Sequence, residues 1–472
     1  MLRLRMPVLL AGLLASACTV GPDYHRPQIA TPSAWQATRP HGGHLAQLSD
    51  WWSRFDDPIL VHLQELAEKN SPSLEQAVAR IDAARADLSS SRADALPSLT
   101  GTGKYTRSSQ TFSTGGVGIT SDTAGFQWGG DASWEIDLFG KVRRNNQAAR
   151  ARIDERIDDW HDARVSLAAE VADDYTQLRG CEQLAKLYSQ QSQSQGETAR
   201  LTRISARAGF TAPSDADLAD ASAASIRSTY TDQVAQCDLL VKSLVSLTGE
   251  DETALRAVLA AGTGELPRPE IFEVTSVPAD LVRQRPDVAS AERELAATSA
   301  EIGAAVADLF PSLSLSGSIS QGGGTKSWSF GPTLSLPIFD GGRNRAAVRS
   351  KKAAYALQLA TYRETVRSAV LEVEQALVRL GSARAREIDA ERSAQGYQAS
   401  FVANDKLYQA GSSSLLDRES SRRDALDAQR GLVSLRQSQV QYWIALYKAL
   451  GGGWNAADRS VTKPSSIGVT HP

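Results

Sequence analysis

Two of the three cysteines are spaced so that they could form a covalent bond with each other. Cys181 and Cys237 lie at equal distances along the chain from Gly209, one before it and one after it. If Gly209 marks the turn of an antiparallel helical hairpin, the two thiols lie at the same height, where an oxidising compartment allows a disulfide. Both positions also suit small buried side chains, because Cys237 lies on an apolar stripe and Cys181 lies three residues after Leu178. The spacing leaves both interpretations open, a hairpin disulfide or two buried thiols.

The third cysteine, Cys18, follows MLRLRMPVLLAGLLASA, which has the organisation of an export signal. Its apolar run is far shorter than the roughly 20 residues that a membrane-spanning helix needs. The segment LASAC is similar to the cleavage site of bacterial lipoproteins, although Ala15 stands where that site usually has leucine. In that class Cys18 becomes the mature N-terminus with N-acyl and diacylglycerol chains, and Thr19 after it implies sorting to the outer membrane. The alternative is a plain secretory signal that happens to contain a cysteine.

Other residue types with catalytic or metal-binding chemistry do not form a recognisable site. The sequence contains no H-E-x-x-H and no G-x-S-x-G motif, and GGGTKS at Gly322 lacks the Gly-Lys order of a phosphate loop. His41 and His44 could share a metal ion, but their Pro/Gly-rich stretch is more typical of an ordinary polar loop. We therefore expect no enzymatic activity and no cofactor, apart from the lipid on Cys18.

The composition is that of a folded protein without a nucleic-acid-binding surface. The chain has 472 residues, of which 42% are hydrophobic and 22% charged, which suffices for two domains or one duplicated unit. Its formal net charge is −3, so it lacks the dense basic surface that neutralises a phosphate backbone. Both methionines precede Cys18, which excludes a thioether copper(I) site in the mature chain.

Two stretches of the chain match each other, which indicates an internal duplication. SPSLEQAVARIDAARADLSSSRADALPSL and RPDVASAERELAATSAEIGAAVADLFPSL share alanine-rich helical spacing and two prolines at one offset. Each copy is expected to run helix, strand, loop, strand, very long helix, turn, helix. The expected segments are a signal peptide at 1–17, a lipid-anchored N-terminal segment at 18–58, a first repeat at 59–250, an inter-repeat linker or equatorial region at 251–278, a second repeat at 279–452 and a polar tail at 453–472.

The strands, expected at about 98–139 and about 312–339, alternate between apolar and polar residues. Trp134, Ile136 and Leu138 alternate with their polar neighbours Ser133, Glu135 and Asp137. Ordinary half-buried sheets do the same, but here the flanking helices offer no apolar face broad enough to cover a sheet. We therefore expect a mainly α protein with membrane β-strands. Four strands cannot close a barrel and open edges are not tolerated in hydrocarbon, so the barrel must be shared between subunits.

Each strand pair is followed by a long stretch without proline, from Lys141 to about Ala208 and from Arg343 to about Ala410. Such helices are ~100 Å long, and their narrow, alanine-filled apolar stripe suits packing side by side in a cylinder wall. Both end in matching turns at about 208–215 and 410–417, where glycine can cap the helix and serine can cap the returning one. Two matched tips far from the strands are well placed to touch a partner.

Together these pieces resemble the outer-membrane factor family (NodT/TolC-like), the channel proteins of tripartite efflux pumps, and in particular the lipoprotein branch of RND-type systems. The matching segments include CTVGPDYHRP, DWWSRFDDPIL, SWEIDLFGKVRR, FGPTLSLPIFDGGRNRAAV and ALYKALGGGW. The resemblance implies a homotrimer with a twelve-stranded outer-membrane β-barrel and an α-helical periplasmic barrel. It also implies a passive conduit that docks a periplasmic adaptor protein and an inner-membrane RND-type transporter to export small molecules.

The resemblance also suggests roles for individual residues. Leu416 would be an apolar constriction, Asp417 a tip carboxylate, and Ser420 stands where several relatives place a gate aspartate. Glu135 and Asp137 would face the barrel lumen and favour cations, unless they lie on an ordinary solvated strand face. The residues expected at the adaptor-docking tips are Ala208, Gly209, Phe210, Asp215, Ala410, Gly411, Ser412 and Asp417.

A periplasmic adaptor or coiled-coil scaffold lipoprotein is the alternative function. Such a protein also carries a lipid-modified cysteine and a long helical hairpin. It needs only one hairpin together with compact β-domains, whereas this chain has two hairpins and two amphipathic strand pairs. The sequence therefore favours the channel, and it does not indicate which solutes pass.

Overall fold

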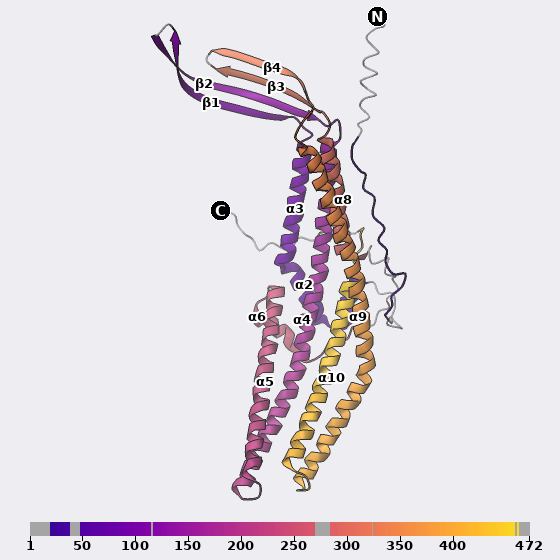
Figure 1. The fold of residues 1–472 in the computed structure, drawn as a ribbon. Coiled ribbons are helices and arrows are strands. Elements are labelled where there is room, and N and C mark those ends of the chain that lie inside the picture. Colours follow the sequence, from indigo (N-terminus) through magenta and orange to yellow (C-terminus); the bar gives the residue numbers. More distant parts are fainter. Residues whose placement is uncertain are drawn as a thin grey trace. The chain divides into compact units, whose positions relative to one another are not determined.

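The computed structural model describes residues 19–37, 48–114, 117–269, 284–322, 324–457 and 460–461 (Figure 1). The expected signal peptide, Cys18, His41 and His44 lie outside these residues. Contacts within the chain divide it into two units, one with residues 1–29, 79–157 and 290–364, and the other with residues 30–78, 158–289 and 365–472. The first unit contains the strands, and the second contains both helical tips.

The described elements repeat in pairs, in which the helices are almost equal in length and the strands of the second copy are shorter. The matched pairs are α3 (Pro72–Ala93) with α8 (Pro286–Ala307), β1 (Ser98–Thr114) with β3 (Ser312–Gly322), β2 (Val117–Ile136) with β4 (Thr325–Ser335), α4 (Lys141–Arg207) with α9 (Arg343–Gln409), and α5 (Pro213–Thr248) with α10 (Leu415–Ala449). Both α4 and α9 have 67 residues. The remaining elements are η1 (Leu48–Phe55), α2 (Pro58–Asn70), α6 (Glu252–Leu259) and η2 (Ala260–Gly262).

The helix boundaries follow from local sequence. The α3 and α8 helices both begin at proline, which suits the first helical position because its missing N–H would have no partner there. Asp57 caps α2, since its carboxylate accepts hydrogen bonds from the backbone N–H groups of Ile59 and Leu60. The stretch after residue 250, expected to be an inter-repeat linker or equatorial region, begins with a helix, α6, which Asp251 caps in the same way.

The four strands form one antiparallel sheet in the order β1-β2-β3-β4. β1 pairs with β2 and β3 pairs with β4, so each copy forms its own β-hairpin. The two β-hairpins join through β2 and β3, where Trp134 pairs with Leu315 and Glu135 with Ser314. The sheet leaves β1 and β4 as its two edge strands within the described part of the chain.

One face of the sheet is apolar and exposed. The strand register places Phe126 opposite Tyr105 and Ile319 opposite Trp328, so these side chains share a face. The exposed fraction is 80% for Trp328, 70% for Phe330 and 67% for Leu334. None of the described elements of the unit covers this face. The opposite face is lined with hydroxyls, and Ser318 and Ser320 bond across the ladder to serines of β4.

The core of the second unit is aromatic near the ends of η1 and α10. The Trp51 ring stacks on that of Tyr447 with centroids 4.9 Å apart, and Trp52 meets the same ring edge-on at 4.6 Å. The Tyr447 hydroxyl donates to the carbonyl of Gly452 at 2.9 Å. These contacts explain the DWWSRF and ALYKALGGGW segments as core packing.

The position of Gly451 has no room for a side chain. Its φ is 87°, and a Cβ there would overlap the carbonyl oxygen of Gln284. The close approach lets Arg285 donate to the Ala449 carbonyl at the end of α10 at 3.0 Å while it pairs with Asp287 and Glu372. The start of α8 and the end of α10 are thereby joined.

Among the described residues, no helix combines the length and the apolarity that a membrane crossing requires.

Candidate functional site

The polar face of the sheet carries few charges. Glu135 lies on this face of β2, as predicted, opposite Ser314. Two further charged residues share the face: Asp131, which pairs with Ser318 and Thr100, and Lys104, which pairs with Gln127. Sequence reasoning missed both, although counting in steps of two from Glu135 would have reached Asp131. The face is therefore a hydroxyl surface with isolated charges.

Asp137 was predicted to lie on the strand with Glu135, and this placement is wrong. The ladder ends at Ile136, and the Asp137 carboxylate accepts hydrogen bonds from the backbone N–H groups of Val142 and Arg143 at 3.2 and 3.0 Å. It also pairs with the Arg143 guanidinium. The carboxylate caps the beginning of α4 because it satisfies N–H groups that have no partner within the helix.

The second junction between strand and helix uses a different residue for the same purpose. Asp340 accepts hydrogen bonds from the N–H groups of Gly342 and Asn344, both at 2.8 Å, and these bonds lower its pKa. Gly341 and Gly342 have φ of 64° and 89°, and Gly140 at the first junction has φ of 81°. Glycine thus permits the bend at both junctions.

The two long helices end in the same backbone motif. At the first tip, Gly209 N–H donates to Ala206 and Phe210 N–H donates to Ser205, at 3.1 and 2.9 Å. At the second tip the equivalent donors are Gly411 and Ser412, at 3.0 and 2.8 Å. Both glycines have positive φ, 78° and 76°. This is the Schellman arrangement, which requires a left-handed residue after the helix.

The returning helices begin differently. Ser414 is the N-cap of α10: its hydroxyl accepts from the backbone N–H of Asp417 and donates to the Asp417 carboxylate. The N-cap of α5 is Ala212, followed by Pro213 at the first helical position, with no side-chain hydrogen bond. A serine was expected to cap each returning helix; Ser414 does so at the second tip, and no serine side chain does so at the first.

The residues predicted to form the docking tips and the constriction gather at these two turns. Phe210 is 84% exposed and Leu416 is 60% exposed. Asp417 and the tip residues Ala208, Asp215 and Ala410 belong to the turns or the first turn of the returning helix. Leu416 and Ser420 are one helical turn apart on α10, so they lie along one face.

A buried cluster of charges lies directly behind the second tip. Arg418 pairs with Asp405 of α9 at 2.5 Å, donates to the Thr198 hydroxyl of α4 at 2.8 Å, and lies within 3.2 Å of Glu419. One turn later Arg422 donates to Gln195 of α4. We call these six residues the tip ion cluster: Gln195, Thr198, Asp405, Arg418, Glu419 and Arg422.

The tip ion cluster is desolvated. The Arg422 side chain is 5% exposed, and burial lowers the pKa of its guanidinium. Each arginine also lies over a ring, Arg418 over Tyr408 and Arg422 over Phe401. Buried charges need their partners, so the cluster ties α10 to both α9 and α4. Sequence reasoning did not identify it, because no local pattern brings α4, α9 and α10 together.

Of the two interpretations of Cys181 and Cys237, the structure contains the disulfide. It joins α4 to α5 with the two Cα atoms 5.6 Å apart across a sequence separation of 56 residues. The bond lies within one hairpin, so it fixes α5 against α4 and does not link the two hairpins.

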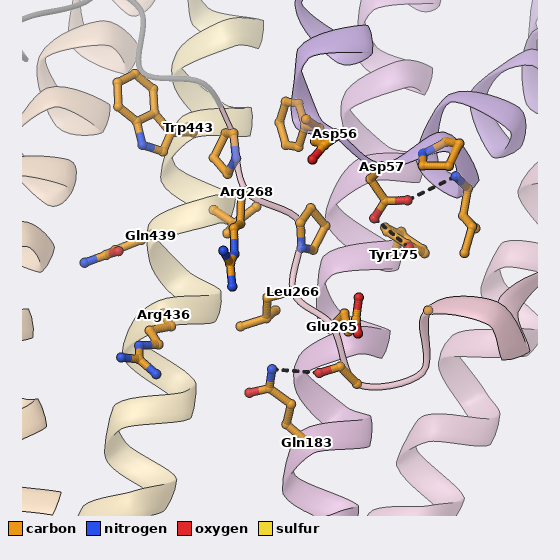
Figure 2. Close-up of a pocket in the computed structure, with 18 of the residues that line it drawn as sticks. Asp56, Asp57, Tyr175, Gln183, Glu265, Leu266, Arg268, Arg436, Gln439 and Trp443 are labelled. Carbon is orange, nitrogen blue, oxygen red and sulfur yellow. Dashed lines mark hydrogen bonds between the residues drawn. The ribbon is translucent and has the colours of Figure 1, made fainter. Parts of the chain in front are cut away.

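The second unit also contains a polar cavity of about 1120 Å³ beside the segment that leaves η2 (Figure 2). Figure 2 shows Arg268, Arg436 and Trp443 on one side and Asp56, Asp57 and Tyr175 on the other. Tyr175 donates to the Asp57 carboxylate at 2.8 Å, and Gln183 donates to the carbonyl of Gly264 at 2.8 Å.

The described residues that line this cavity include no serine, cysteine or histidine, and they carry carboxylates, guanidinium groups and a phenol. Asp56 is the one non-glycine residue with positive φ in the described part of the chain, at 52°. Its backbone turns so that Asp57 can cap α2.

Comparisons with known proteins agree with this arrangement. The family model "Outer membrane efflux protein" matches residues 63–250 and 277–452, nearly the two predicted repeats. Nodulation protein T of Rhizobium leguminosarum bv. trifolii is 32% identical over 94% of this chain and 96% of its own length. Outer membrane protein OprJ of Pseudomonas aeruginosa is 31% identical over 95% of both chains.

Solved structures have the same fold. The outer-membrane channel OprN superimposes with a TM-score of 0.80 at 30% identity, over 93% of this chain and all of the other. The CmeC outer membrane channel of Campylobacter jejuni gives a TM-score of 0.80 at 23% identity, over 93% and 96% of the two chains. The predicted resemblance and the predicted outer-membrane efflux channel are confirmed, and the adaptor alternative is not favoured. The chain belongs to the outer membrane efflux protein family.

Proposed function

We propose that three copies of this chain form the passive exit conduit of a tripartite efflux pump. The observation that carries the proposal is the four-stranded sheet, which has an exposed apolar face and two edge strands, β1 and β4, without partners in the single chain. Open edges are not stable in hydrocarbon, whereas pairing β4 of one copy with β1 of the next closes a barrel. Three copies supply twelve strands, enough to enclose a water-filled lumen.

The sheet's polar face lines the lumen on this proposal. Hydroxyl groups of Ser318 and Ser320 keep it wettable without binding a solute strongly. Asp131 and Glu135 outnumber Lys104 on this face within the described strands, so the lumen weakly favours cations. Asp137 takes no part in this preference, because its carboxylate caps α4.

The two helical tips are the docking surface for the periplasmic adaptor. Phe210 is exposed at the first tip, and an exposed aromatic side chain is suited to anchor a partner. Leu416 and Asp417 from three copies form the constriction at the closed end. An inner-membrane transporter supplies the energy, and the conduit itself performs no bond chemistry.

Cys18 carries the lipid that holds the N-terminus at the outer membrane. The support is the export signal before it and the LASAC sequence. Radiolabelled palmitate should be incorporated into the wild-type chain and not into Cys18→Ser. Incorporation into both, or into neither, would remove the lipid from the proposal.

The docking role of the tips is tested with matched glycine variants. Gly209→Ala and Gly411→Ala place a Cβ on residues with φ of 78° and 76°, which costs about 1–2 kcal/mol and reshapes each tip. Gly196→Ala and Gly431→Ala are the controls, because a Cβ there meets no neighbouring atom within 4 Å. We expect weaker efflux and weaker cross-linking to the adaptor only in the tip variants. Unchanged efflux and cross-linking in both tip variants would refute the docking assignment.

A further inference from the structure

The first described residues of the chain occupy a site built from backbone and side chains of the first unit. The Val20 N–H donates to the carbonyl of Phe139 at 3.2 Å, just where β2 has ended and α4 has not yet begun. Thr19 lies against Gly140, where a Cβ would come within 2.8 Å of the threonine methyl group. The junction between strand and helix is thus shaped to receive this segment.

Arg144 of α4 holds the same segment with most of its donors. Its Nε donates to the Val20 carbonyl at 3.1 Å, and its Nη2 donates to the Gly21 carbonyl at 3.3 Å and to the Asp23 carboxylate at 2.9 Å. The fourth bond goes to Gln147 on its own helix. The Arg144 side chain is 5% exposed while that of Asp23 is 80% exposed. The buried partner is therefore the guanidinium, and the N-terminal segment supplies the groups that satisfy it.

Two glycines allow the segment to approach this closely. A Cβ on Gly21 would overlap the Cα of Gly303 on α8, and Gly21 also has φ of 90°. A Cβ on Gly303 would in turn come within 2.8 Å of Arg144 Nε. Neither position tolerates a side chain without moving the backbone or the guanidinium.

Tyr24 is a second anchor point, and its partner lies on α8. The Tyr24 hydroxyl donates to the Glu292 carboxylate of α8 at 2.6 Å. Burial and this hydrogen bond raise the pKa of Tyr24, so the phenol keeps its proton and remains a donor. The segment is therefore fixed at both ends of residues 19–24.

We propose that Gly140, Arg144 and Gly303 form a docking site for the chain's own residues 19–24, which fixes where the N-terminus leaves the folded unit. We call this site the anchor cradle. Cys18 directly precedes Thr19 in the sequence, so an acyl chain on Cys18 would be attached one residue before the docked segment. The consequence for the lipid rests on the proposed function, whereas the docking itself does not.

The role of Arg144 in the cradle is to position the segment. Its guanidinium reaches two carbonyls and one carboxylate at once, which needs the planar fork of an arginine. Lysine would keep the charge and lose this geometry, so Arg144→Lys should behave more like Arg144→Ala than like the wild type.

The test is cleavage by endoproteinase Asp-N before Asp23 in the purified full chain, followed by mass spectrometry of the N-terminal peptide. Cleavage reports how often the segment leaves the cradle, because a docked segment cannot enter the protease. We expect at least tenfold faster cleavage in Arg144→Ala and in Gly21→Ala. Gly21 lies in the docked segment, so its variant leaves the packing among the helices intact and remains informative if Arg144→Ala misfolds.

The controls are Arg150→Ala, an exposed arginine on the same helix, and His25→Ala, an exposed residue directly after the docked segment. Both should be cleaved at the wild-type rate. Equal cleavage of the wild type and Gly21→Ala would overturn the cradle. Cys18→Ser separates the two proposals, because it should lose the acyl groups and keep Asp23 protected. Loss of protection in that variant would mean that the lipid and not the cradle holds the segment.

Discussion

The two helical hairpins have almost equal lengths and are stabilised by different bonds. The first, α4 with α5, is closed by the Cys181–Cys237 disulfide, and Ala219 and Ala223 of α5 pack against Ala199 of α4 near its tip. The second, α9 with α10, is tied by the tip ion cluster, which also reaches α4. The first hairpin is therefore held together covalently within itself. The second is bound to itself and to its neighbour by contacts that can separate and form again.

This difference indicates which hairpin can move at the tip. A disulfide keeps α4 and α5 at a fixed spacing whatever the tip does. Breaking the contacts of Arg418 and Arg422 loosens the tip of α10 from α4 without breaking a covalent bond. If the conduit opens at this end, we expect the second hairpin to move away from the first. The following variants test this comparison, from the largest expected effect to the smallest.

Arg418→Ala should have the largest effect. It leaves Asp405 without its 2.5 Å partner and removes the bond to Thr198. Removing one member of a buried ion pair costs about 3–5 kcal/mol. We expect hydrogen exchange to accelerate around the second tip and a large, normally excluded antibiotic to enter the cell.

The matched control for Arg418→Ala is Arg423→Ala, since Arg423 lies on the same helix and is exposed. It should exchange at the wild-type rate. Equal acceleration in the two variants would contradict a specific role for the tip ion cluster.

Opening the disulfide should have the next largest effect, limited to the first hairpin. A cross-link over 56 residues stabilises a fold by roughly 2–4 kcal/mol, mainly by restricting the unfolded chain. Cys181→Ser with Cys237→Ser should speed hydrogen exchange in α5 and leave the second tip unchanged. Slower exchange, or an equal change in both hairpins, would argue against the contrast between them.

The thiols themselves can be counted. An alkylating reagent applied under denaturing conditions should label Cys181 and Cys237 only after reduction. Labelling before reduction would show that the disulfide is absent from the isolated protein.

Changes to the N-caps of the two returning helices should have the smallest effect. Removing the cap of α10 should destabilise the second tip, and adding a cap to α5 should stabilise the first tip. Ser414→Ala removes the side-chain N-cap of α10 and should destabilise the second tip by about 1 kcal/mol. Ala212→Ser gives α5 the side-chain acceptor that it lacks and should stabilise the first tip by several tenths of a kcal/mol. Local exchange rates at each tip measure both changes, and a shift of the same sign in the two variants would contradict the assignment.

The sequence predicted the elements of the fold well because the signals are local and repeated. Proline marks the beginning of both α3 and α8, and the absence of proline and the glycine caps delimit α4 and α9 to within a residue. Strand alternation gave the two faces of the sheet. Asp137 was misplaced because the alternation continues past Ile136, where the hydrogen-bond ladder stops and the helix cap begins.

The sites that depend on distant contacts were not predicted. Arg418 meets Thr198 across 220 positions and Arg144 meets Val20 across 124, and neither spacing has a local period. Arg144 lies in the SWEIDLFGKVRR segment that carried the family resemblance, yet its partner in the N-terminal segment required the fold. The spacing of Cys181 and Cys237 about one hairpin turn allowed a disulfide but left two buried thiols equally open, and the fold decided between them.

The central claim, a conduit shared by three copies, is tested most directly by electron-microscope imaging of the protein solubilised from outer membranes in mild detergent. We predict threefold particles with a short membrane barrel and a helical tunnel on the order of 100 Å long, the length of a 67-residue helix. Slender single-chain particles without a barrel would contradict the claim.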